Sequence, residues 1–154
     1  MPTRLGATTS EQSGRWSRCS TAHDPAAART TFLISAERTS GAVDELIADD
    51  DDAAIAAITL AELRVGVHLA DDTHRAARQA FVDLVLEVLP VVGYDVDVAA
   101  AHAELLAHVR RSGTPRGAHD LIIAATGLAT GRIIVTADQV AFDSLPGVEV
   151  RSHQ

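Results

Sequence analysis

The stretch from His119 to Phe142, HDLIIAATGLATGRIIVTADQVAF, constrains the fold of this chain more than any other. Residues Leu121 to Leu128 are apolar almost all round, which predicts a helix that is covered on most sides. Gly131 is placed to end this helix, because helices commonly close on a glycine in the left-handed conformation. Residues Arg132 to Val135 then predict a short interior strand with β-branched side chains.

The lengths of this helix and this strand place two acidic residues near each other. About twelve helical residues rise roughly 18 Å, and about five strand residues return roughly 17 Å. Asp120 at the helix start and Asp138 just past the strand end are therefore expected at the carboxyl edge of a sheet, where open α/β folds bind ligands. Each acid alone also has a structural explanation, since Asp120 would complement the helix dipole and Asp138 would cap a loop.

Composition narrows the class of protein. The 154 residues suffice for one domain with a buried core, and the apolar residues are mostly Ala, Val, Leu and Ile, which suits parallel strands covered by helices. The single cysteine, Cys19, excludes an intrachain disulfide and fits a reducing, cytoplasmic location. No apolar run approaches the roughly 20 residues of a membrane span, so we expect no membrane association.

The net charge of −8 argues against non-specific coating of nucleic acid. It is compatible with an enzyme that holds nucleic acid through metal ions and a few arginines. Residues 1–28 have no helical or strand periodicity, so we expect them to be disordered or loosely attached, and residues 29–154 to form the folded domain. Within that domain, the sequence after Ile34 predicts an amphipathic helix, and the acidic run Asp49–Asp52 predicts a solvated loop.

A second strand-then-helix junction brings a third acid to the same edge. Residues Ala53 to Ile58 form a short apolar run that predicts an interior strand, and Thr59 is a candidate N-cap for the helix that follows. Glu62 lies in the first turn of that helix. We therefore expect Glu62 to join Asp120 and Asp138 at the carboxyl edge.

The remaining elements complete an alternation of strands and helices. A basic, turn-rich loop, RRSGTPRGA, delivers the chain to Asp120. The other expected elements are a helix that starts at Asp71 and Asp72, a strand over Val88 to Val92, an amphipathic helix over Val96 to Arg111 and an edge strand over Val148 to Val150.

Three clustered carboxylates repel one another unless a cation neutralises them. Ligand sets made only of oxygen favour a hard ion, Mg²⁺ or Mn²⁺, which keeps several of its waters. Such a site can orient a phosphodiester and activate a water for in-line attack. The sequence has no histidine pair with metal-ligand spacing, no serine with triad partners and no glycine-rich phosphate loop. A phosphatase-type hydrolase would need a nucleophilic aspartate in a DxD context at a strand end, which we do not find.

These residues resemble the PIN domain family, and most closely its VapC-type toxin ribonucleases from bacterial toxin–antitoxin pairs. The matching pieces are TTFLISAER, ITLAELRVGV, HDLIIAATGLATG and VTADQVAFDSLPGVEV, which together span residues 30 to 150. The resemblance implies a three-layer α/β/α sandwich with a mainly parallel central sheet, whose acids bind Mg²⁺ or Mn²⁺ and cleave RNA. By position it gives catalytic and metal-binding roles to Glu62, Asp120 and Asp138, with Thr136 beside the last of them.

The start of the domain departs from the family's pattern. The family's first motif is an apolar strand that ends in Asp, followed by Thr, whereas here Arg29 stands at the Asp position, before Thr30 and Thr31. We hypothesise that the original first strand has been replaced, which would remove a central strand and the leading metal ligand. Asp24 or Glu37 could substitute, the first only in a different register and the second only from the following helix.

Two functions of different classes follow from these observations. The first is a metal-dependent endoribonuclease that acts as the toxin of a toxin–antitoxin pair, with a cognate antitoxin as partner, RNA as substrate and a homodimer as the family's assembly. The alternative is a catalytically impaired PIN-like module that binds antitoxin or RNA without efficient cleavage. Thr31 and Arg116 are further candidate site residues, in the first motif and in the basic loop respectively.

Overall fold

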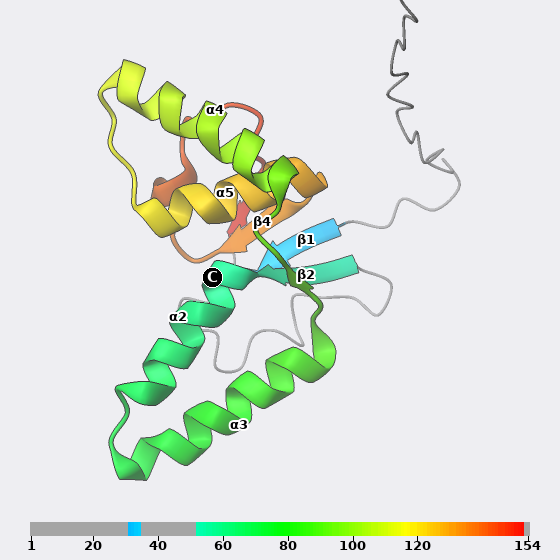
Figure 1. Cartoon of the computed structure of the whole chain (residues 1–154), viewed down its shortest axis with the longest axis vertical. Coiled ribbons are helices and arrows are strands. Elements are labelled where there is room, and N and C mark those ends of the chain that lie inside the picture. The colour runs from blue at the N-terminus through cyan, green and yellow to red at the C-terminus, as the bar shows by residue number, and fades with distance from the viewer. Residues whose placement is uncertain (1–30, 35–51, 153–154) are drawn as a thin grey trace, which may run out of the picture.

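The computed structural model describes residues 31–34 and 52–152, and its helices flank a sheet on both sides (Figure 1). The strands are β1 Thr31–Ile34, β2 Asp52–Ala56, β3 Val91–Val92, β4 Ile133–Thr136 and β5 Val150–Ser152. The helices are α2 Ala57–His68, α3 Asp72–Val88, α4 Val96–Ser112 and α5 Ala118–Thr130, with a short 3-10 helix, η1, at Val140–Phe142. The expected boundary between residues 28 and 29, and the helix expected after Ile34, lie outside the described residues.

The five strands form one sheet in the order β3-β2-β1-β4-β5, and all four strand pairs are parallel. Helices α4 and α5 lie on one face of this sheet, and α2 and α3 lie on the other (Figure 1). The predicted three-layer α/β/α sandwich with a parallel sheet is therefore confirmed.

Strand β2 shows how the sequence serves both faces. Ala54 and Ala56 belong to the larger core, where α4 and α5 pack on the sheet, whereas Ala53 and Ile55 pack against α3 and α2. Successive strand residues point to opposite faces, so a continuously apolar strand is required wherever both faces are covered. The run AAIA in β2 meets this requirement with three alanines and one isoleucine, all of them buried.

The central strand is formed by residues that the sequence analysis did not assign to it. Thr31–Ile34 pairs with β2 on one side and with β4 on the other, and Leu33 is completely buried. The hypothesis that this chain lacks a central strand is therefore wrong. The run Phe32–Ile34 has the apolar, β-branched and aromatic composition that an interior strand needs, and it fills the position itself.

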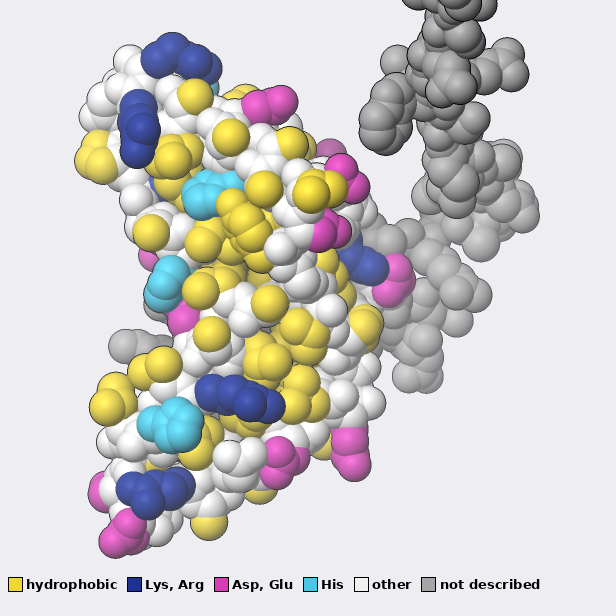
Figure 2. All heavy atoms as spheres, viewed as in Figure 1, with side chains coloured by type: hydrophobic (Ala, Val, Ile, Leu, Met, Phe, Trp, Pro, Cys, Tyr) yellow, Lys and Arg dark blue, Asp and Glu magenta, His cyan; other side chains and the backbone are white. Residues whose placement is uncertain are grey.

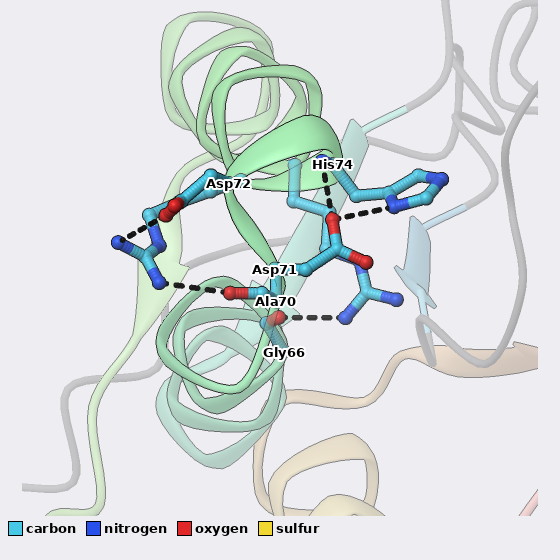
Figure 3. Close-up of polar contacts among 7 residues, drawn as sticks. Gly66, Ala70, Asp71, Asp72 and His74 are labelled. Carbon is cyan, nitrogen blue, oxygen red and sulfur yellow. Dashed lines mark hydrogen bonds and ion pairs between the residues drawn. The ribbon is translucent and has the colours of Figure 1, made fainter.

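Helices α2 and α3 form a hairpin that is stabilised at its turn (Figure 3). Asp71 is the N-cap of α3, as its predicted start requires, and its Oδ1 accepts a hydrogen bond of 2.9 Å from the amide of His74. Arg78 of α3 donates from Nη1 to the carbonyl of Gly66 at 2.7 Å, which satisfies one of the last carbonyls of α2. The hairpin is thus held by polar contacts at its turn in addition to its packing.

Several predicted boundaries differ from those observed. Helix α2 begins after Ala56 with no side-chain cap, so the prediction of Thr59 as N-cap is wrong. The Thr59 hydroxyl is buried, and no described residue forms a hydrogen bond with it. Asp52 opens β2 instead of lying in a solvated loop. Strand β3 is limited to Val91–Val92 and β5 lies two residues later than expected, whereas α4 and α5 match their predicted spans closely. Among the described residues, no helix is both long enough and apolar enough to cross a membrane.

An arginine joins the amino ends of β2 and β4, the two strands that flank β1. Arg132 donates from Nη1 to the Asp52 carbonyl at 2.8 Å, and its Nη2 lies 3.0 Å from the Asp52 carboxylate. The Arg132 side chain is only 15% exposed. A pair with one shielded partner is screened less by solvent than an ordinary surface ion pair, so this contact should contribute to the stability of the sheet.

We expect Arg132→Ala to destabilise the protein by about 1–3 kcal/mol, because it removes a hydrogen bond from a charged donor and a partly shielded ion pair. Urea unfolding measures the change. The matched control is Arg111→Ala, which removes an exposed arginine that has no partner in the described part of the chain and should change stability by less than about 0.5 kcal/mol. Equal effects of the two substitutions would show that the Arg132–Asp52 contact contributes nothing.

Candidate functional site

Asp120 lies in the first turn of α5, a helix whose interior is strongly buried. Leu121 and Ile123–Gly127 of this helix are all buried, and they fix it against the sheet. The N-cap residue is Gly117, and no side chain caps the helix. The Asp120 carboxylate folds back over Gly117, since a Cβ built on that glycine would lie 2.3 Å from Oδ2 of Asp120. Asp120 thus places its charge at the positive end of the helix dipole.

The surroundings of Asp120 raise its pKa above the ordinary value of 3.8. Partial burial is the largest cause, followed by the negative charges of Glu62 and Asp138, while the neighbouring His119 acts in the opposite direction. Two like charges can perturb Asp120 only if they lie close to it. The structure therefore brings Glu62, Asp120 and Asp138 to the same edge of the sheet.

Asp138 follows the carboxyl end of β4 and is held by the turn it belongs to. Its amide donates to the buried hydroxyl of Thr136 at 3.0 Å. Its Oδ1 accepts from the amides of Val140 at 3.1 Å and Ala141 at 3.3 Å, which caps η1. The structural explanation of Asp138 thus holds for one of its oxygens. The contacts place Thr136 beside Asp138, and within residues 31–34 and 52–152 they involve only Oδ1 of the Asp138 carboxylate.

Glu62 projects from α2, on the other face of the sheet, and its contact with α5 runs through a histidine. Oε1 of Glu62 lies 2.5 Å from Nδ1 of His119, and both side chains are partly exposed. Sequence reasoning missed His119. Its position next to Asp120, at the start of a helix aimed at the acid cluster, was the available signal. The contact fixes one oxygen of Glu62 and joins the two helical layers at the site.

The three acids supply the carboxylate oxygens that a divalent cation such as Mg²⁺ prefers, but their side chains are not close enough together to enclose an ion. Within residues 31–34 and 52–152, no three His, Cys, Asp or Glu side chains lie close enough together to hold a metal ion. Mg²⁺ usually keeps several waters and binds one or two carboxylates directly. The pKa of Asp120 is raised by burial and, to a smaller extent, by the charges of Glu62 and Asp138. The three carboxylates together are oxygen donors with excess negative charge, which such an ion would neutralise.

Arg116 lies in the loop between α4 and α5. It connects the segment that leads to Asp120 with the segment that follows Asp138. Its Nη2 donates to the carbonyl of Asp143 at 2.8 Å, and its buried Nε has no hydrogen-bond partner in the described part of the chain. Asp143 directly follows η1, which Asp138 caps, and Arg116 stands four residues before Asp120. The position of Arg116 therefore supports the spacing between Asp120 and Asp138.

Thr31 lies away from the other candidate residues. It begins β1 and is paired in register with Asp52, the first residue of β2. In a parallel sheet this is the amino edge, opposite to the edge where the acids gather. The expectation that Thr31 belongs to the site assumed that the central strand precedes it, whereas the strand begins at Thr31. Arg29, Asp24 and Glu37 lie outside the described residues.

The chain belongs to the PIN domain family, whose sequence profile matches residues 30–148. The relatives that the chain resembles in sequence include several VapC ribonucleases. Ribonuclease VapC5 of Mycobacterium tuberculosis is 36% identical over 125 residues, which cover 78% of this chain and 90% of that protein. The tRNA(fMet)-specific endonuclease VapC of Salmonella typhimurium is 32% identical over 98 residues, covering 62% of this chain and 71% of that protein.

Solved structures of toxin–antitoxin complexes share the fold. The VapBC-5 complex of Mycobacterium tuberculosis matches with a TM-score of 0.70 and 31% identity, covering 80% of this chain and 99% of the matched chain. VapBC2 of Rickettsia felis, bound to a DNA fragment from its promoter, matches with a TM-score of 0.71 over 81% of this chain and 100% of the matched chain. At 21% identity, this second likeness concerns the fold alone.

We expect Asp120→Asn to gain stability relative to the wild type as pH rises. Below the unfolded pKa of 3.8, Asp120 is protonated in both states and contributes nothing. Above that value the unfolded chain ionises first, so Asp120 costs stability, and the cost is complete once pH passes the raised pKa of the folded state. Asparagine has no such cost. Urea unfolding from pH 3 to 7 with a chelator present measures the difference between variant and wild type.

Asp71→Asn is the control of opposite sign. The hydrogen bonds from His74 lower the pKa of Asp71, so its contribution is present above pH 3.8 and is lost as pH falls through the lowered folded value. The stability of Asp71→Asn relative to the wild type should therefore fall with rising pH. A pH-independent difference for Asp120→Asn would show that neither burial nor the other acids raise the pKa of Asp120 in the folded protein.

Proposed function

We propose that this protein is a Mg²⁺- or Mn²⁺-dependent endoribonuclease and the toxin component of a toxin–antitoxin pair. The observation that carries this proposal is that, in a PIN-family fold, Glu62 and Asp138 lie near enough to Asp120 for their charges to raise its pKa, in addition to the larger effect of burial. It is supported by relatives that are named ribonucleases and by similar structures that are toxin–antitoxin complexes. The cytoplasm is the expected location of such a system.

Each acid would contribute differently to a bound ion. Asp120 is half-buried at a helix N-terminus and is the natural direct ligand, because its repulsion from the other two acids is relieved by a cation. Asp138 offers the oxygen that does not cap η1, and Glu62 offers the oxygen that does not contact His119. The ion, when bound, would supply Lewis-acid stabilisation of phosphodiester cleavage. Thr136 would keep Asp138 in place.

The segment of residues 108–119 supports RNA as the substrate. It comprises the C-terminal end of α4, the loop of residues 113–117 and the first two residues of α5. From His108 to His119 the chain has three arginines and no acid, in a protein with a net charge of −8. Arg110 and Arg111 are exposed, and neither has a partner in the described part of the chain. Figure 2 shows basic side chains over the C-terminal end of α4. A hollow of about 340 Å³ adjoins them, and it is lined by Leu106, Val109, Arg110, Gly113, Pro115, Arg116 and Leu121.

A cognate antitoxin is the proposed protein partner, and a homodimer is the proposed assembly. The α2–α3 hairpin exposes large apolar side chains, namely Val65, Leu69, Leu84, Leu86 and Val88. Leu69 is 80% exposed. Several large apolar side chains left exposed on two helices that pack together favour an interaction surface. We therefore assign the α2–α3 hairpin to contacts with protein partners, without dividing it between the antitoxin and the second copy of the chain.

The impaired binding module remains the second candidate, because β1 supplies no carboxylate. Its sequence is TFLI, so the central strand adds no acid to the edge where the other three gather. A site with one ligand fewer binds a divalent ion more weakly. The two candidates differ in whether purified protein cleaves RNA when Mg²⁺ or Mn²⁺ is added.

We expect purified protein to cleave a mixed RNA substrate when Mn²⁺ is added and to be inactive with a chelator. Asp120→Asn should lower cleavage by at least about 100-fold, because it removes the charge of the most buried ligand while keeping its size. Cleavage is followed by gel electrophoresis of end-labelled RNA. Metal-dependent RNA binding without cleavage would favour the impaired module, and wild-type activity in Asp120→Asn would remove Asp120 from the site.

We expect Arg110→Gln with Arg111→Gln to weaken RNA binding mainly through phosphate contacts. Two lost contacts on a single strand should reduce the slope of log K against log salt by about 1.4, at roughly 0.7 per contact. The measurement uses fluorescence anisotropy in an Asp120→Asn background, which prevents cleavage. Thr73→Glu with Ala80→Glu, at exposed positions of α3, lowers the net charge equally and is the control. If both pairs change the slope equally, only net charge matters and these arginines do not contact RNA.

A further inference from the structure

We propose that Gly117 is a positioning residue for Asp120, because its missing side chain provides the space in which the Asp120 carboxylate rests. This inference rests on the proposed function, in which Asp120 is a metal ligand. It adds a residue that neither contacts the metal nor carries a functional group. Gly117 affects the site only because its lack of a side chain leaves space for the carboxylate of Asp120, three residues later.

The space at Gly117 is already occupied by the carboxylate. A Cβ added to Gly117 would lie 2.3 Å from Oδ2 of Asp120 and 3.2 Å from its Cγ. Carbon and oxygen atoms that are not bonded do not approach to 2.3 Å, so one of the two groups would have to move. The three nearest atoms that such a Cβ would meet all belong to Asp120. Any residue other than glycine therefore competes with one particular side chain.

Backbone conformation does not explain the glycine. Gly117 has φ −58° and ψ 141°, which every residue adopts readily. Gly113 and Gly131, by contrast, have φ of 68° and 64° at the ends of α4 and α5, where the left-handed conformation favours glycine. Of these three glycines, Gly117 is the one that a larger residue could replace in backbone conformation, so only the space beside Asp120 requires a glycine there.

Capping preference does not explain it either. Gly117 is the N-cap of a helix with no side-chain cap, a position where Ser, Asp or Asn is preferred over Gly. A serine here would satisfy a free amide of α5, but its Cβ would fill the same space as that of alanine. The chain thus forgoes a side-chain cap at the position where the Asp120 carboxylate folds back.

Asp120 is the group that would yield. Its carboxylate is the end of a flexible side chain, whereas Gly117 is fixed by the carbonyl that accepts from the amide of Leu121 at 3.1 Å. Rotation of Asp120 about its χ1 bond relieves the clash at small cost to the fold. The same rotation removes the carboxylate from the neighbourhood of Glu62 and Asp138. A substitution at 117 should therefore impair metal binding much more than folding.

The test compares Gly117→Ala and Gly117→Ser with Gly93→Ala. A Cβ at Gly93 meets nothing within 4 Å, so that variant controls for a glycine-to-alanine change outside the site. Calorimetry with Mn²⁺ should show about tenfold or more weaker binding for both Gly117 variants and wild-type binding for Gly93→Ala. Thermal unfolding should show Gly117→Ser at or above the wild-type Tm, because serine is a better cap. A serine variant that is stable but defective in metal binding excludes general destabilisation as the cause.

Two further measurements separate this inference from the proposed function. In an Asp120→Ala background, Gly117→Ala should cause no further loss of Mn²⁺ affinity, since the competing carboxylate is gone. A crystal structure of Gly117→Ala should show the Asp120 side chain rotated away from residue 117. If the wild type binds no Mn²⁺ and cleaves no RNA, the proposed function fails, and the crystal structure still decides the role of Gly117. An unmoved carboxylate, or wild-type Mn²⁺ affinity in Gly117→Ala, overturns the inference.

Discussion

The common direction of the five strands is the constraint on which the rest of this structure depends. Because every pairing is parallel, the carboxyl ends of β2, β1 and β4 emerge at one edge, and the chain can return only through covering helices. Glu62 follows β2 and Asp138 follows β4, while α5 starts at the same edge in order to deliver the chain to β4. Acids that lie far apart in the sequence are thereby brought near one another, and their negative charges add to the effect of burial, the largest cause, in raising the pKa of Asp120.

The fold tolerates this repulsion because the helix that carries Asp120 is anchored elsewhere. Leu121 and Ile123 are almost completely buried, and full burial of such a side chain contributes about 1.5–3 kcal/mol. The stability of α5 therefore depends on its apolar contacts, and its first turn can hold a carboxylate that is unfavourable on its own. Asp138 differs, because its Oδ1 caps η1 and so contributes to local structure as well. The same edge thus contains one acid that strains the fold and one that supports it.

Sequence patterns predicted most of the fold and named the three acids of the candidate site, and where they failed the failures have physical causes. Apolar periodicity located α4 and α5, and the glycine at 131 ended α5 as expected, because both depend on local preference. The central strand was missed because the four residues of β1 are too few to show periodicity, and only the tertiary need for a strand between β2 and β4 identifies them. Thr59 was mistaken for a cap because α2 continues β2 without a turn, which buries Thr59 inside the first helical turn. His119 and Gly117 were overlooked because contact with Glu62 and free space for Asp120 arise only in three dimensions.

The connection between α4 and α5 combines features that no single secondary-structure pattern records. Its two ends are fixed by Val109 and Leu121, which are buried in the same core, and Arg116 ties its middle to the loop after η1. The arginines, the free space at Gly117 and Asp120 are therefore held in a set relation by the packing of two helices on one face of the sheet. Glu62 comes from the opposite face, and His119, in the first turn of α5, contacts it. The site is consequently assembled from two layers, and its geometry depends on how α2 and α5 are positioned across the sheet edge as much as on any one acid.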